Sequence, residues 1–182
     1  MSGLLEQPVL ILREKISYAQ FRLTDEAGAD VGLVRGSLTD YEHFDLEGLG
    51  GEKLATFRWG GEGGLGGVLV KGLQVFATDE RHVGTVVVKR GDVTILDPAD
   101  SELVRAEGGV GNRTPAQLYD ASGAQVAAVG AVKAGLWRSL NGENDYRIDF
   151  VGEPAEDLRL LIIAAPVAWD RKITGGPRMP GD

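Results

Sequence analysis

The sequence predicts a mainly β protein whose short strands form either a closed barrel or a sandwich. Three observations predict this fold class. Short apolar segments alternate with acidic, glycine-containing turns, one segment alternates strictly between apolar and charged residues, and a single apolar helix follows the strands near the C-terminus. Up to residue 151 no segment shows a helical pattern, and many short strands with glycine-rich turns are typical of barrels and sandwiches.

The chain uses one hairpin pattern three times. Each copy has an apolar strand, a turn that contains aspartate, and a second strand that reads V-[GA]-x-V. Aspartate can bond its own backbone in a turn, and glycine supplies positive φ. The copies are unequally spaced, so they indicate a hairpin reused inside one domain and not a solenoid. The predicted strand pairs are Ile16 to Leu23 with Val31 to Arg35, Gln74 to Ala77 with Val83 to Val88, and Ala116 to Tyr119 with Val126 to Val129.

Other segments also have the pattern of strands. In Asp145 to Val151 the apolar Tyr146, Ile148 and Phe150 alternate with charged residues, which predicts one buried and one solvated face. The remaining predicted strands are Val9 to Leu12, Val68 to Lys71, Val93 to Leu96, and Glu102 to Ala106.

One hydrophobic helix is predicted after the last strand. Proline and acids at Pro154 to Asp157 suit a helix start. Leu158 to Trp169 is apolar except for Arg159, so this helix should be buried, and Pro166 should kink it or end its first hydrogen-bonded stretch. It should thread a barrel or cross a sheet. The residues expected to be buried along it are Leu158, Leu161, Ile162, Ala165 and Trp169.

Length and charge limit the class of protein. The chain has 182 residues, no cysteine, and a net charge of −8. We expect a single domain over residues 1–173, with an irregular loop at 39–67 and a flexible tail at 174–182. The absence of cysteine excludes disulfides and thiol chemistry, and the acidic balance argues against nucleic-acid binding. The start has the pattern of neither a signal peptide nor a membrane span, so we expect a cytoplasmic protein.

The order of these motifs resembles the tubby-like, LURP-one-related and phospholipid scramblase superfamily. The resemblance rests on QPVLILREK at the start, the unit FRLTDEAGADVGLV with its echo QLYDASGAQVAAV, and the ending DYRIDFVGEPAEDLRLLIIAAPVAWD. It implies a closed antiparallel barrel of about twelve strands around a buried C-terminal helix. A different small β-barrel or sandwich is the alternative.

The ligand sites of this superfamily match poorly. Scramblases carry an acidic, calcium-associated segment before the final helix, but Gly142 stands at its leading carboxylate position here. We therefore expect the acids of this strand to be solvated on its outer face. Tubby domains bind phosphoinositides through a basic pocket, and the only basic pairs we match are Lys89-Arg90 and Arg171-Lys172. The palmitoylated cysteines of scramblases have no counterpart.

The candidate contact residues for a ligand or surface are Lys89, Arg90, Trp137 and Arg138. We assign no catalytic, cofactor or metal-binding residue. His43 and His82 have nearby acids but lie in predicted turns or loops. The GEGGLG stretch at 61–66 formally matches a dinucleotide fingerprint, but a strand and not a helix follows it, so we interpret the match as chance.

Three functions remain open at this stage. The first is a non-catalytic binding or scaffold module that acts on a protein partner or at a membrane surface, with a phospholipid headgroup as its ligand. The second is a carrier of a small apolar ligand or lipid in a barrel cavity. The third is an enzyme without a recognisable motif. The sequence favours the first, because no nucleophile and base are paired in it and because the family resemblance supports a binding role.

Overall fold

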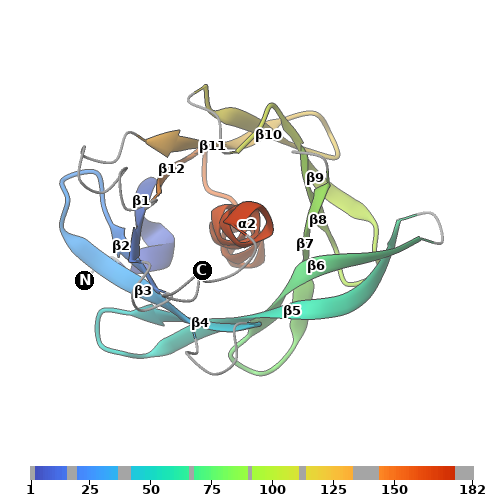
Figure 1. Cartoon of the computed structure of the whole chain (residues 1–182). Coiled ribbons are helices and arrows are strands. Elements are labelled where there is room, and N and C mark those ends of the chain that lie inside the picture. The colour runs from blue at the N-terminus through green and yellow to red at the C-terminus, as the bar shows by residue number, and fades with distance from the viewer. Residues whose placement is uncertain are drawn as a thin grey trace.

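Twelve antiparallel strands close into a barrel around one helix in the computed structural model (Figure 1). The structure describes residues 3–15, 20–36, 42–65, 68–89, 92–110, 114–132 and 144–174. The elements are η1 (Leu4–Glu6), β1 (Val9–Lys15), β2 (Gln20–Thr24), β3 (Asp30–Gly36), β4 (His43–Gly48), β5 (Lys53–Leu65), β6 (Val68–Ala77), β7 (His82–Lys89), β8 (Asp92–Leu96), β9 (Glu102–Glu107), β10 (Ala116–Asp120), β11 (Gln125–Val132), β12 (Asp145–Phe150) and α2 (Glu156–Thr174).

Each strand pairs with its neighbour in sequence, and the first strand pairs with the last. The closing pair runs from Val9 opposite Asp149 to Arg13 opposite Asp145. This is an up-and-down barrel, and closure leaves no unpaired sheet edge. The prediction of a closed barrel is therefore confirmed, and the sandwich alternative is wrong.

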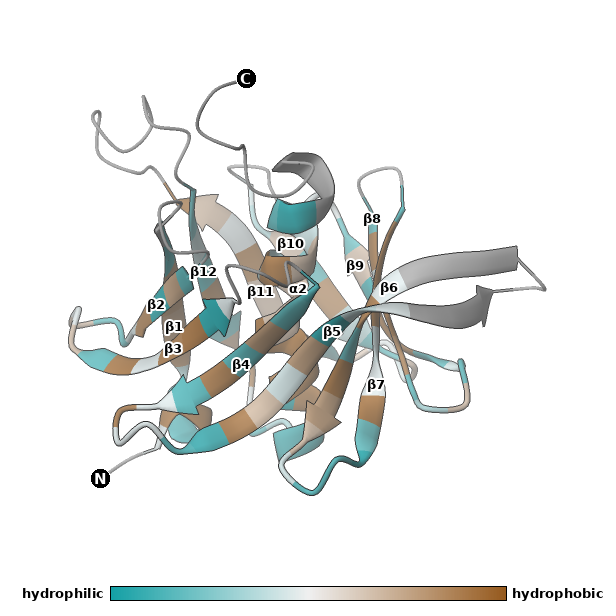
Figure 2. Ribbon diagram, turned by 60° about the horizontal axis from the view of Figure 1, so that its bottom comes forward, coloured by the Kyte–Doolittle hydropathy of each residue, from teal (hydrophilic) through white to brown (hydrophobic). Residues whose placement is uncertain are grey.

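Side chains alternate between the inside and the outside of the barrel wall. In β4, Phe44 and Leu46 are fully buried while their neighbours are partly exposed. Figure 2 shows the same alternation as hydrophobic and hydrophilic bands along the strands. Tyr146, Ile148 and Phe150 point into the core as the sequence predicts, but Asp145 is buried too, so the expectation that the acids of this strand are all solvated is wrong for Asp145.

Helix α2 occupies the inside of the barrel (Figure 1). Residues 159–171 are buried without interruption, which is the pattern of a helix surrounded on all sides. Leu161, Ile162, Ala165 and Trp169 are buried as predicted, whereas Leu158 is only half-buried. The helix does not end at Pro166 but continues to Thr174. A proline removes one hydrogen bond, and the surrounding wall holds the helix on both sides of it.

The expectation of an irregular loop at 39–67 is wrong for most of its described residues. Residues 43–48 form β4, and residues 53–65 form β5, which pairs with β6 as far as Leu65 opposite Val68. Backbone pairing needs no side chain, so a glycine-rich segment can still form a strand beside a regular neighbour. The expected strand start at Ile16 lies outside the described residues. Of the expected tail, 174–182, the structure describes only Thr174, which is the last residue of α2.

A charge placed in the middle of α2 should prevent folding. Ile162 is fully buried, so Ile162→Asp would bury an unpaired carboxylate and should cost about 4 kcal/mol or more. Val151→Asp is the matched control, because Val151 is 45% exposed and follows the last strand. Thermal unfolding should show a lost or strongly lowered transition for the first variant and a nearly normal one for the second. Equal melting temperatures would contradict the central position of α2.

Candidate functional site

The two ends of the barrel carry different chemistry. The lower mouth, as Figure 2 is oriented, holds the turns at 25–29, 49–52, 78–81, 97–101 and 121–124 and the start of α2. The upper mouth holds the end of α2. In an up-and-down barrel alternate connections lie at the same end, so the repeated acidic turns all gather at the lower mouth.

Aspartate side chains fasten four of these turns. The Oδ1 atom of Asp25 accepts a bond from the Ala29 N–H at 2.8 Å, and that of Asp120 accepts bonds from the Ser122 and Ala124 N–H groups at 2.9 and 3.0 Å. Asp79 and Asp97 bond their own turns in the same way. The Ser122 hydroxyl also donates to Asp120 Oδ1, at 2.6 Å, and this bond contributes most to holding the pKa of Asp120 below its usual value. The aspartates of the repeated acidic motif therefore stabilise the turns of the hairpins.

A hollow opens at this mouth between α2 and the barrel wall. Its volume is about 540 Å³, which is within the range of small-molecule pockets. We call it the mouth pocket. Most of its lining is apolar, and the polar residues stand at its rim. It is lined by Arg81, Val83, Pro98, Leu103, Asp120, Ala121, Ser122, Ala155, Asp157, Leu158 and Leu161.

The mouth pocket lies on the side of α2 that faces β7. The helix packs most closely against β7, followed by β6 and β8. Gly84 on β7 makes this approach possible, since an added Cβ would collide with the Leu96 carbonyl oxygen and lie 3.2 Å from both terminal carbons of Leu161. The pocket opens beside this contact, because Val83 of β7 and Leu161 of α2 line it together with the turns at 97–101 and 121–124.

An ion pair closes one side of the pocket rim. Arg81 donates from Nη1 to Asp157 Oδ2 at 2.8 Å and from Nη2 to Oδ1 at 3.0 Å. These bonds lower the pKa of Asp157 below its usual value. Through this pair the 78–81 turn is joined to the first turn of α2, so the pocket wall is fixed to the helix it surrounds.

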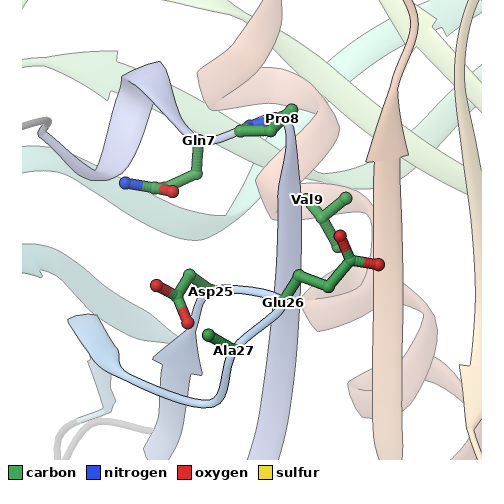
Figure 3. Close-up of a pocket in the computed structure, with 6 residues that line it drawn as sticks. All are labelled: Gln7, Pro8, Val9, Asp25, Glu26 and Ala27. Carbon is green, nitrogen blue, oxygen red and sulfur yellow. The ribbon is translucent and has the colours of Figure 1, made fainter.

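Two smaller hollows lie at the same mouth. One of about 370 Å³ lies between the start of β1 and the 25–29 turn, and Figure 3 shows Asp25 and Glu26 on one side of it and Gln7 and Pro8 on the other. Another of about 350 Å³ reaches the buried Arg159, whose Nη1 donates to the Gln7 carbonyl at 2.9 Å and whose guanidinium lies 4.4 Å from the centre of the Phe150 ring. Burial lowers the pKa of Arg159.

The lower mouth is predominantly acidic. Seven carboxylates and two guanidinium groups are found among the residues that line the three hollows. They are Glu6, Asp25, Glu26, Glu52, Asp120, Glu156 and Asp157 against Arg81 and Arg159. Arg81 is held by Asp157, and Arg159 is 7% exposed. An approaching ligand therefore meets mostly negative charge around an apolar hollow.

The upper end of the barrel contains a buried polar cluster, which we call the carboxyl cluster. The cluster consists of Glu14 in β1, Asn144 just before β12, Tyr146 in β12, and Asp170 and Arg171 in α2. Tyr146 Oη donates to Asp170 Oδ1 at 2.8 Å, and Asn144 Nδ2 donates to the same oxygen at 3.2 Å. The Asn144 N–H donates to Glu14 Oε2 at 3.1 Å. Glu14 is 3% exposed and Asp170 is 1% exposed.

The predicted contact residues receive no support as a site. Lys89 is exposed at the end of β7, whereas Arg90, Trp137 and Arg138 lie outside the described residues. Whether they form a binding surface therefore stays a prediction. Of the predicted helix residues, Leu158 and Leu161 also line the mouth pocket.

Each of the two histidines contacts a residue close to it in the sequence. His43 Nε2 lies 3.4 Å from Asp45 Oδ1, which also pairs with Lys53 at 2.8 Å. His82 Nε2 lies 3.3 Å from Thr85 Oγ1. Within the part of the chain that the structure describes, no group of three or more histidine, aspartate or glutamate side chains is placed to hold a metal ion.

Sequence reasoning missed both the mouth pocket and the carboxyl cluster. The cluster had a local signal, because Leu10, Leu12 and Glu14 occupy the same face of a strand and two of them are plainly core residues. Asp170, directly after an apolar run, was the second signal. The mouth pocket had no such signal, since its lining comes from distant parts of the chain, from Arg81 to Leu161.

Comparison with known proteins supports the fold. No family model matches the chain, and no curated protein matches it. Among solved structures the barrel is similar to AT5G01750, a protein from Arabidopsis thaliana, with a TM-score of 0.57 and 19% identity. The match covers 92% of this chain and 93% of that chain. At this identity the likeness establishes a shared barrel architecture. Among the described helices, none has the length and apolar composition that a bilayer crossing requires.

Replacing Gly84 with alanine should lower the free energy of unfolding far more than replacing a glycine in a turn. Gly84→Ala forces Leu96 or α2 to move and should lower the unfolding free energy by about 3 kcal/mol. Gly123→Ala is the control, because nothing lies within 4 Å and only its positive φ of 84° is unfavourable, which should cost about 1 kcal/mol. Denaturant unfolding measures both. Equal losses would mean that neither Leu96 nor α2 crowds position 84.

Proposed function

We propose that this chain is a member of the tubby-like, LURP-one-related and scramblase superfamily and acts as a non-catalytic binding module. The family part is supported by the strand order, the closing helix and the sequence motifs that resemble that superfamily. The binding part is carried by one observation, the apolar mouth pocket beside the start of α2.

The pocket suits one apolar group that enters from outside. Its floor is formed by Leu158 and Leu161 of α2 with Val83 and Leu103 of the wall, and exposed turn residues such as Ala121 stand at its edge. Deeper inside the barrel, beyond the pocket floor, the space is filled by the buried residues of the helix. A group inserted at the mouth would therefore be stopped by the helix, as an anchoring side chain of a protein partner would be.

The charge around the pocket selects the partner's chemistry. Asp120 and Asp157 line the mouth pocket, its arginine Arg81 is already paired with Asp157, and the two smaller hollows at this mouth add five further carboxylates. Complementary charge speeds association and suppresses wrong partners. The favoured partner therefore presents an apolar side chain flanked by basic residues, and an anionic membrane surface fits this mouth poorly.

A second candidate function is the carriage of a small apolar ligand. The same hollow favours it, because about 540 Å³ can hold a short aliphatic chain. A carrier shields its ligand from water, whereas this pocket is bordered by exposed turns, so the binding module fits better. Catalysis is not part of the proposal, since the aspartates at this mouth are engaged in turns and an ion pair.

Blocking the pocket tests the proposal directly. The neutral fluorescent probe N-phenyl-1-naphthylamine should bind the wild type saturably. Ala121→Trp should weaken binding about tenfold or more by filling the pocket from its edge. Ala27→Trp is the control, because Ala27 is also an exposed alanine in an acidic turn at this mouth but lies at another hollow. No saturable binding, or equal loss in both variants, would contradict the proposal.

The same assay tests the charge preference. Decylamine and decanoate have the same chain length and opposite charge, so the amine should displace the probe at a lower concentration, and added salt should reduce the difference. Equal competition by the two would show that the acidic residues do not contribute to recognition.

A further inference from the structure

The carboxyl cluster lies at the opposite end of the barrel from the mouth pocket, and the proposed function makes no use of it. It joins the first strand to the last turns of α2, two parts of the chain separated by more than a hundred residues. We propose that Glu14 and Asp170 form a proton-dependent latch that holds the C-terminal end of α2 against the barrel wall and releases it when the shared proton is lost.

The geometry brings two acids into one buried site. Asn144 bridges the Glu14 and Asp170 carboxyl groups, because its N–H donates to Glu14 Oε2 and its Nδ2 donates to Asp170 Oδ1. Two carboxyl groups that share a buried site favour a proton on one of them. Tyr146 Oη and Asn144 Nδ2 both donate to Asp170 Oδ1. Glu14 accepts from the Asn144 N–H. The proton therefore belongs mainly to Glu14.

The groups around Glu14 also favour a proton on its carboxyl group. Burial is the largest cause and the charge of Asp170 the next, and together they raise the pKa of Glu14 to about 7. Arg171 opposes this shift, but its effect is smaller than both. From β12, Tyr146 faces the cluster as a neutral donor, and burial raises its own pKa. From β2, the neighbour across the strand pair is the apolar Phe21.

Two of the three guanidinium nitrogens of Arg171 form no hydrogen bond with the pair. Its guanidinium lies over two aromatic rings, 5.8 Å from the centre of Phe21 and 5.3 Å from that of Phe44. Its Nε and Nη2 atoms are buried without hydrogen-bond partners. When Glu14 loses its proton, two carboxylates face each other in a site that excludes water, and such a pair is strongly unfavourable.

The sign of the pH effect follows from the direction of the shift. The folded protein holds a proton on Glu14 that the unfolded chain releases near the ordinary value of 4.5. Folding is therefore favoured at acidic pH, and this contribution is lost as the pH rises from about 4.5 to about 7. Above that range the last turn of α2 can escape the repulsion by leaving the wall, while the middle of the helix remains enclosed.

Hydrogen exchange with residue resolution tests the latch. In the wild type, the protection of amides 170–174 should fall about tenfold or more between about pH 6 and about pH 8.5, after correction for intrinsic exchange. Glu14→Gln keeps the size and a hydrogen-bond donor but cannot ionise, so protection should stay constant. Glu102→Gln is the control, because Glu102 is an exposed glutamate on a strand and its loss should leave the wild-type response.

A second variant guards against a folding defect. Asp170→Asn removes the other charge and should also abolish the pH response. The latch is overturned if Glu14→Gln and Asp170→Asn both respond to pH as the wild type does, or if the wild type shows no response. It is also overturned if all amides lose protection together, because the pair would then affect the whole fold and not the end of α2.

Discussion

The interior of the closed barrel has to be filled, and α2 fills it. Small barrels are filled by their own side chains, whereas wider ones enclose a cavity or need a plug. Here the inward residues of twelve strands meet a helix that is buried from residue 159 to residue 171. Among the described residues, the apolar surfaces of the barrel wall and of the helix pack into one shared core. The strands depend on the helix for their core, and the helix, apolar on every side, depends on the strands to keep it from water.

This mutual dependence also explains where chemistry remains available. With the middle of the barrel occupied, usable space and polar groups are confined to its ends. At the lower mouth, Gly84 lets α2 approach β7, and the apolar mouth pocket opens beside this contact. At the upper end, α2 carries Asp170 and Arg171 into the interior, where Glu14 and Tyr146 meet them. One end is suited to recognition, and the other is suited to holding the helix in place.

Much of the architecture could be predicted from local patterns. The alternation of Tyr146, Ile148 and Phe150 and the apolar run before Trp169 report burial directly, because periodicity records which side faces the core. The glycine-rich part of β5 was misjudged, since its strand character comes from pairing with β6 and not from its own side chains. Closure through β1 and β12 and the mouth pocket are non-local, so no window of sequence contains them. Glu14 could have been found, because it continues the inward series of Leu10 and Leu12.

The most direct test of this account is native-state hydrogen exchange of the α2 amides at 160–169, followed as a function of denaturant. If barrel and helix form one cooperative core, these amides exchange only through global unfolding, and their opening free energy equals that of the whole protein. The core amides of the strands should then give the same value and the same denaturant dependence. Exchange of the helix at a lower free energy, while the strands stay protected, would show that α2 can leave an intact barrel and would contradict the account.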